Sequence, residues 1–101
     1  MTDIDVMNAL KVDLQIITTE GVEGDALNEY LKSLILTAKS RIREEGITLT
    51  GDPNDRNLIE QYAAWLYRAR KDEKAAEKMP RPLRYGLNNR LFAEKAKKGL
   101  N

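Results

Sequence analysis

Apolar residues return at helical spacing in four stretches of the chain, and the first two are separated by glycines. In residues 3–14 they recur three or four positions apart. In residues 25–45, where Asp25 is the candidate cap, they gather within about 100° of arc, as in a helix that packs on one side. The members of this stripe are Leu27, Leu31, Leu34, Ile35, Ala38 and Ile42. We therefore expect two helices with a break at Gly21 and Gly24.

The third stretch, which starts at Asp52 or Asp55 and runs to about Lys71, has the widest apolar surface. One stripe consists of Leu58, Tyr62, Trp65, Leu66 and Ala69. The additional apolar residues Ile59, Ala63 and Tyr67 widen it to roughly 200° of arc. A helix with so wide an apolar surface packs on two sides. We expect it at the centre of the core, with Trp65 and Leu34 both buried.

The segment that joins the second and third stretches is predicted to be a loop. Gly46 reads as the carboxyl cap of the second helix, and Gly51 and Pro53 interrupt any regular structure. The run Asp-Pro-Asn-Asp that follows superficially resembles the start of a calcium loop. However, Arg56 and Asn57 occupy the positions where an EF-hand needs a ligand and a glycine. A turn with a helix cap is the better interpretation, and we expect no metal or other cofactor.

The fourth stretch follows a charged segment, residues 70–78, that we interpret as the frayed end of the third helix. Pro80 and Pro82 stop that helix, and a short helix can begin near the second proline. On it Leu83, Leu87 and Leu91 recur every four residues, with Tyr85 and Phe92 opposite. The sequence predicts an all-α fold, a small bundle with three core helices in residues 1–78. Residues 79–101 form a basic, aromatic C-terminal arm or short fourth helix.

Charge is distributed unevenly, although the net charge of the chain is only +1. Residues 1–30 hold seven acids and one base, and residues 67–101 hold eleven bases and four acids. Such a polarity suits head-to-tail association of copies, or contact of the basic end with phosphate or an acidic partner. The alternative is that the fold intermixes the acidic and basic segments, so that their charges are simply solvated on one common surface.

The residue types that most catalytic sites require are missing. The chain has no cysteine and no histidine, which excludes cysteine-ligated metal sites and removes the commonest general base. Ser33 and Ser40 are the only serines, and neither has a histidine to activate it. No apolar run approaches the roughly 20 residues of a membrane span, and the acidic start lacks the apolar segment of a signal peptide. We expect a protein that is not an enzyme, is not secreted and does not bind a membrane.

Six residues are candidates for a protein interface, because they do not fit a simple core. They are Leu36, Arg81, Arg84, Tyr85, Arg90 and Phe92. The first lies on the polar side of the second helix, and the others interleave arginine with aromatic side chains on the arm. That composition is typical of interface hot spots. We expect the arginines to find acids on a neighbouring subunit, acids on another protein, or DNA phosphate. Ordinary exposure of these side chains is the alternative.

The chain is small, helical and basic at one end, so a DNA-binding regulator is the second hypothesis. A helix-turn-helix motif joins its helices by a turn of about 3–4 residues. Here about eight residues lie between the second and third helices. The third helix also has apolar residues on two sides and is therefore expected to be buried on both. A helix that reads a DNA groove cannot be buried in this way.

The order of the segments resembles the small head–tail connector (adaptor) proteins of tailed bacteriophages and prophages. The resemblance covers about residues 5–95. It starts with LKVDLQI and the long helix DALNEYLKSLILTAKSRIREEGI, and continues after the loop with YAAWLYRAR and MPRPLRYGLNNRLF. The aromatic third helix followed by a basic arm with prolines is its most specific part.

The resemblance implies a structural virion protein without catalysis. Connector proteins of this kind assemble as a homo-oligomeric ring beneath the portal, after the head is filled with DNA. The ring extends the DNA channel and provides a platform for the next tail-side component. The implied partners are the portal protein and that tail-side component. The resemblance also allows non-specific contact with DNA in the channel. The implied location is the head–tail junction of the virion, and the bacterial cytoplasm during assembly.

Overall fold

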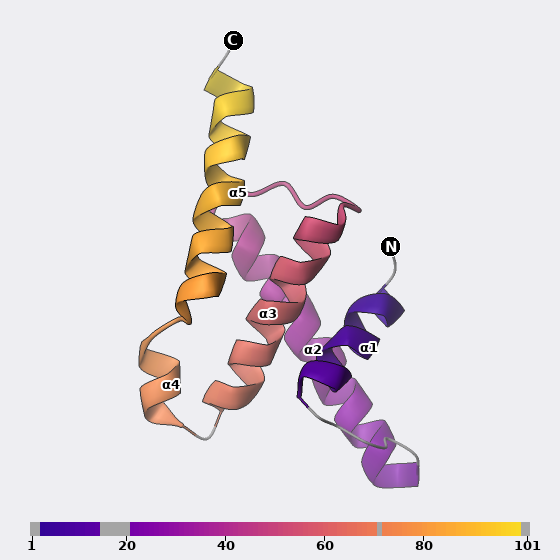
Figure 1. Cartoon of the computed structure of the whole chain (residues 1–101). Helices are drawn as coiled ribbons and strands as arrows, with labels where there is room; N and C mark the ends of the chain where they lie inside the picture. Colours follow the sequence, from indigo (N-terminus) through magenta and orange to yellow (C-terminus); the bar gives the residue numbers. More distant parts are fainter. Residues whose placement is uncertain (1–2, 15–20, 71, 100–101) are drawn as a thin grey trace.

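Helix α3 (Pro53–Ala69) lies at the centre of the computed structural model and contacts each of the four other helices. The others are α1 (Asp3–Asp13), α2 (Gly21–Glu44), α4 (Glu73–Glu77) and α5 (Arg81–Gly99), as Figure 1 shows. The structure describes residues 3–14, 21–70 and 72–99, and these residues contain no strand. The predicted all-α fold, a small helical bundle, is confirmed.

The start of α3 is fixed by its own sequence. The Asp52 side chain accepts a hydrogen bond of 2.8 Å from the backbone N–H of Asn54, and so caps the helix. Pro53 occupies the first turn, where its missing N–H costs no intrahelical hydrogen bond. Of the two aspartates that the sequence offers for this role, Asp52 is therefore the cap. Asp55 is instead buried in the first turn of the helix.

The core is assembled from the predicted stripes of α2 and α3, together with parts of α1, the loop and α5. Its buried residues are Val6, Leu10, Leu31, Leu34, Ile35, Ala38, Ile42, Ile47, Leu58, Ile59, Tyr62, Ala63, Ala64, Leu83 and Leu87. The expectation for Leu34 is confirmed, whereas that for Trp65 is wrong. Trp65 is only partly buried, and it packs against the edge of the core with its ring in an edge-on contact to Tyr62.

The second helix begins four residues earlier than the sequence suggested. The glycines expected to break the chain, Gly21 and Gly24, both lie inside α2. A glycine in a helix costs about 1 kcal/mol relative to alanine, which weakens a helix without forbidding it. Gly46 differs, because its φ of 107° is a conformation that L-residues with side chains rarely adopt. It ends α2 as predicted.

The charged segment after α3 is a separate element rather than the frayed end of that helix. Residues 73–77 form the short helix α4. The side chain of Asp72 accepts a hydrogen bond of 3.0 Å from the backbone N–H of Lys74, in the manner of a helix cap. This local cap explains why the chain re-enters a helix before the prolines.

The carboxyl-terminal segment is a 19-residue helix, longer than the short helix expected. Its residues Leu83 and Leu87 are fully buried in the common core, so the division at residue 78 does not separate a core from a free arm. Gly86 allows the close approach of α5 to α3. A Cβ atom at that position would lie 2.7 Å from a methyl carbon of Leu58. The first half of α5 therefore belongs to the bundle.

The molecule is elongated and flat, with extents of 52 × 32 × 18 Å. Helices α1 and α5 both pack on α3, and Figure 1 shows them on opposite sides of it. The carboxyl-terminal turns of α5 extend beyond the amino-terminal end of α3. This arrangement exposes one long side of α5 to solvent.

Candidate docking surface

The outer face of α5 carries two aromatic rings and basic side chains. Tyr85 and Phe92 are 61% and 75% exposed. They are seven residues apart, which places them on one side of the helix about 10.5 Å from each other along its axis. Arg81, Asn88, Asn89 and Lys95 are exposed on the same side. We call these six residues the α5 face.

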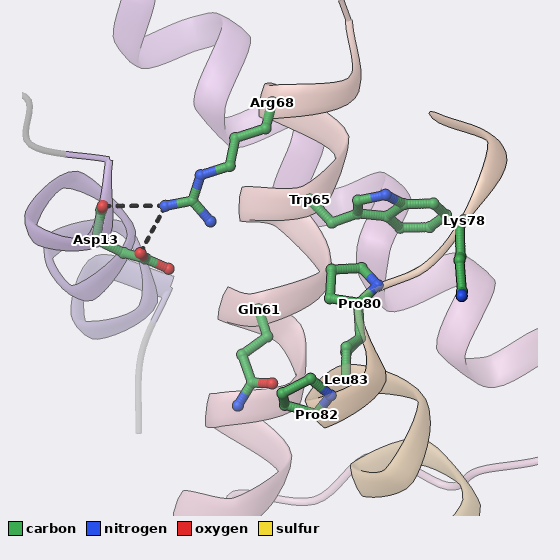
Figure 2. Close-up of a pocket in the computed structure, with 8 residues that line it drawn as sticks. All are labelled: Asp13, Gln61, Trp65, Arg68, Lys78, Pro80, Pro82 and Leu83. Atoms are coloured by element: carbon green, nitrogen blue, oxygen red, sulfur yellow. Dashed lines mark hydrogen bonds and ion pairs between the residues drawn. The ribbon is translucent and has the colours of Figure 1, made fainter. Parts of the chain in front are cut away.

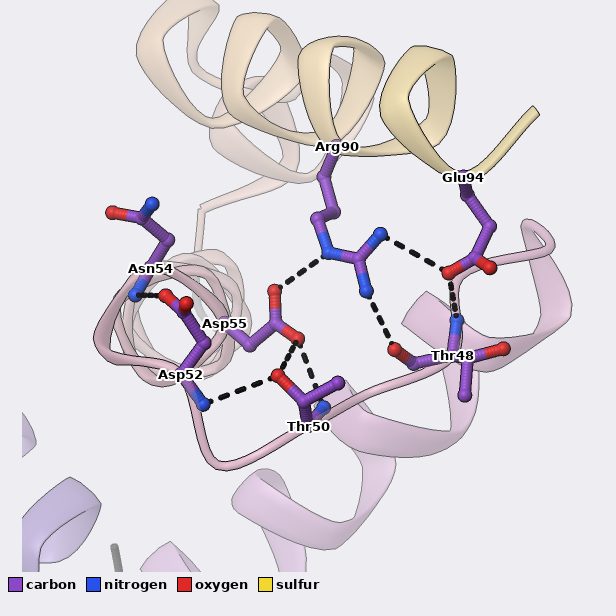
Figure 3. A network of polar contacts seen from close by, with 7 residues as sticks. All are labelled: Thr48, Thr50, Asp52, Asn54, Asp55, Arg90 and Glu94. Carbon is purple, nitrogen blue, oxygen red and sulfur yellow. Dashed lines mark hydrogen bonds and ion pairs between the residues drawn. The ribbon is translucent and has the colours of Figure 1, made fainter. Parts of the chain in front are cut away.

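A polar network holds α5 against α3 and the preceding loop (Figure 3). The guanidinium of Arg90 donates from Nε to Asp55 Oδ1 over 2.8 Å, and from Nη1 to Glu94 Oε1 over 3.0 Å. Its Nη2 donates to the backbone oxygen of Thr48 over 2.7 Å. Thr50 donates its backbone N–H and its hydroxyl to the other oxygen of Asp55, over 2.9 and 3.0 Å. The network joins α3, the loop and α5.

The burial of this network makes it a structural anchor rather than a reactive site. Asp55 is only 1% exposed, and Glu94 is also buried. Hydrogen bonding from Arg90 to the Asp55 carboxylate, together with its negative charge, raises the pKa of the guanidinium above its ordinary value. A buried carboxylate is costly unless it is paired and hydrogen-bonded. The pairing therefore fixes the orientation of α5, and with it the position of Tyr85 and Phe92.

Arg84 also pairs within the chain, so two of the three arginines do not behave as expected. Its Nη2 contacts a carboxylate oxygen of Glu45, directly after α2, and its Nε donates to Asn88 Oδ1 over 3.1 Å. The expectation that Arg84 and Arg90 find their acids outside the chain is wrong. Both lie at positions of α5 that turn toward the bundle, where acids distant in sequence meet them.

The six candidate interface residues fall into three groups. Arg81, Tyr85 and Phe92 come together on the α5 face. Arg84 and Arg90 support α5 from within the bundle. Leu36 lies on α2, outside the α5 face, and is 61% exposed.

A hollow that no sequence pattern predicts lies between α1, α3 and the start of α5. Its volume is about 330 Å³, and Figure 2 shows the residues around it. They are Asp13, Gln61, Trp65, Arg68, Lys78, Pro80, Pro82 and Leu83. The exposed part of the Trp65 ring lies against this hollow, which is why the residue is only partly buried. No local pattern marks the hollow, because its walls come from segments far apart in the chain.

The carboxyl groups of Asp13 and Glu60 interact with each other and with Arg68 where α1 packs on α3. Arg68 Nη2 donates to Asp13 Oδ1 over 2.8 Å and to the Asp13 backbone oxygen over 3.2 Å. Burial, together with a hydrogen bond to Asp13 and the charge of Asp13, raises the pKa of Glu60 to about 8. The hydrogen bond from Glu60 and the Arg68 charge lower the pKa of Asp13. The ion pair of Arg68 with Asp13 joins the end of α1 to α3.

Within the described part of the chain, no group of three acidic, histidine or cysteine side chains is placed to hold a metal ion. No helix among those residues is long and apolar enough to cross a membrane. The described surface offers the α5 face and the hollow.

Comparison with known proteins adds no relative. The chain matches no protein-family model, no curated protein and no solved structure.

Proposed function

We propose that this chain is a structural subunit of a phage head–tail connector, which forms a ring between the portal and the tail and extends the DNA channel. The observation that carries the proposal is the α5 face, on which Tyr85 and Phe92 stand exposed on a helix anchored by a buried ion pair. Exposed aromatics beside arginine are typical of protein interfaces. The resemblance of the sequence to connector proteins is the reason to assign this interface to the head–tail junction.

The anchoring of α5 supports docking to a protein more than flexible contact with DNA. Arg84 and Arg90, two of the three arginines of α5, are engaged inside the chain. A preorganised surface loses little conformational entropy on binding. The portal protein and the tail-side component are the partners of the proposed ring, and catalysis has no part in its role.

The alternative, a small DNA-binding regulator, fits the geometry less well. Eight residues (45–52) separate α2 from α3, against the 3–4 residues of a helix-turn-helix turn. Helix α3 is also packed by each of the other helices, and only Pro53, Asn54, Asn57 and Arg68 of its residues are exposed, whereas a recognition helix presents a whole side to the groove. Tight, sequence-specific binding of duplex DNA would favour this alternative.

The test is deletion of the gene in a phage or prophage that encodes it, followed by complementation. We expect deletion to yield DNA-filled heads and separate tails, and the unaltered chain to restore joining. A variant with Tyr85→Ser and Phe92→Ser should fail, whereas the matched variant with Tyr85→Phe and Phe92→Tyr, which keeps both rings, should complement. Normal joining after deletion would refute the proposal.

A further inference from the structure

A second exposed face lies on α1. Val12 is 79% exposed, which makes it the most exposed of the large hydrophobic side chains in the described part of the chain. Asp5, Asn8 and Ala9 are exposed on the same side of the helix. Asp5 and Val12 are seven residues apart, the same two-turn spacing that separates Tyr85 and Phe92 on α5. We call these four residues of α1 the α1 face.

The two faces differ in charge in a way that makes them complementary. The α5 face combines aromatic rings with the bases Arg81 and Lys95, and the α1 face combines an apolar side chain with the acid Asp5. The segments that carry them repeat this contrast, since residues 1–30 have a net excess of acids and residues 67–101 a net excess of bases. Pairing of one α5 face with another would instead oppose like charges, which is unfavourable.

The faces also lie where two neighbours can use them at once. Helices α1 and α5 pack on opposite sides of α3 (Figure 1), so neither face blocks the other. A contact between two different patches is heterologous, and repetition of it produces a closed ring or an open filament.

We propose that the occupant of the α5 face is a second copy of this chain, which docks through its α1 face in a head-to-tail arrangement. Val12 packs against the Tyr85 and Phe92 rings, and Asp5 lies beside Arg81 or Lys95 according to the direction of α1. This inference rests on the proposed function, because it assigns the contact between neighbouring subunits of the ring.

The absence of cysteine from the chain allows a direct test by disulfide trapping. One chain with Val12→Cys is mixed, at millimolar concentration under mild oxidation, with a second chain with either Tyr85→Cys or Phe92→Cys. We expect mixed disulfide dimers in several-fold excess over the dimers of either chain alone. A single chain that carries both Val12→Cys and Phe92→Cys, or Val12→Cys and Tyr85→Cys, should form a ladder of oligomers. The matched control is Ser40→Cys, an exposed position on α2 outside both faces.

Two results would overturn the inference. One is a yield of mixed dimers no greater than the yield of Val12→Cys with the Ser40→Cys control. The other is a predominance of α5-to-α5 dimers from Phe92→Cys or Tyr85→Cys alone. Failure of the proposed function is a separate result. It would be seen as normal head–tail joining without the gene, whether or not the copies cross-link.

Discussion

Arg90 and Asp55 are 35 residues apart in the sequence, yet the guanidinium Nε donates to the carboxylate over 2.8 Å. The pair links the outermost helix of the bundle to its central helix. Asp55 is buried, so the link is sheltered from solvent. This ion pair therefore helps to fix the position of the α5 face, together with the Arg84–Glu45 pair and the buried side chains of Leu83 and Leu87.

Replacement of Arg90 by Gln should destabilise the fold strongly. The substitution leaves the Asp55 carboxylate buried without its cation, a change that costs about 3–5 kcal/mol. Urea unfolding followed by circular dichroism measures the loss. Arg81→Gln, at an exposed position of the same helix, should change stability by less than about 0.5 kcal/mol.

A double variant tests the reason for that loss. Asp55→Asn together with Arg90→Gln removes both charges, so its destabilisation should be clearly smaller than the sum of the two single losses. Additive losses would show that the two side chains do not act as a pair.

Gly86→Leu should destabilise the contact between α5 and α3, although leucine favours helix formation. A Cβ atom alone would meet Leu58 at 2.7 Å, and a larger side chain overpacks the site at a cost of about 1–3 kcal/mol. Thermal unfolding measures the effect. Adding Leu58→Ala to this variant should recover part of the lost stability, and a further full loss would contradict the close contact.

Stability should fall as the pH rises from about 4.5 to about 8, through the contribution of Glu60. The folded chain keeps the Glu60 proton up to a pKa of about 8, whereas the unfolded chain releases it near 4.5. The unfolded state therefore binds fewer protons across this window, and its stability relative to the folded state grows with pH. The pKa of Asp13, lowered on folding, contributes in the opposite direction only near and below its ordinary value of 3.8.

Glu60→Gln tests this pH dependence, because the amide is neutral and still donates a hydrogen bond. We expect the melting temperature of this variant to decline less between pH 5 and pH 8 than that of the parent. Glu29→Gln, at an exposed position on α2, is the matched control and should follow the parent curve. Equal slopes for all three proteins would remove Glu60 from the explanation.

Leu36→Glu separates folding from assembly. Leu36 is 61% exposed, so the charge should change the free energy of unfolding by less than about 0.5 kcal/mol. If Leu36 belongs to an interface in the proposed connector, complementation of head–tail joining should fail. Leu31→Glu, at a fully buried position of the same helix, should instead unfold the chain. Normal complementation by Leu36→Glu would make Leu36 an ordinary exposed leucine.

Local patterns in the sequence determined the helical fold and its centre. The wide apolar stripe of α3, the single stripe of α2, the cap at Asp52 and the turn at Gly46 all depend on residues within a few positions of each other. Such signals are readable because helical periodicity and capping are short-range. The same periodicity placed Tyr85 and Phe92 opposite the leucines of α5, and both are exposed.

Tertiary structure alone decided which polar groups are buried and what they contact. Nothing near Asp55 in the sequence indicates that it is enclosed, or that Arg90 reaches it from another helix. The raised pKa of Glu60 likewise requires the end of α1 beside α3. The need for a glycine at position 86 follows only from the position of Leu58, which leaves no room for a Cβ atom. These properties depend on contacts between segments far apart in the chain. Periodicity specifies which side of a helix is apolar, but it does not specify which other helix lies against that side.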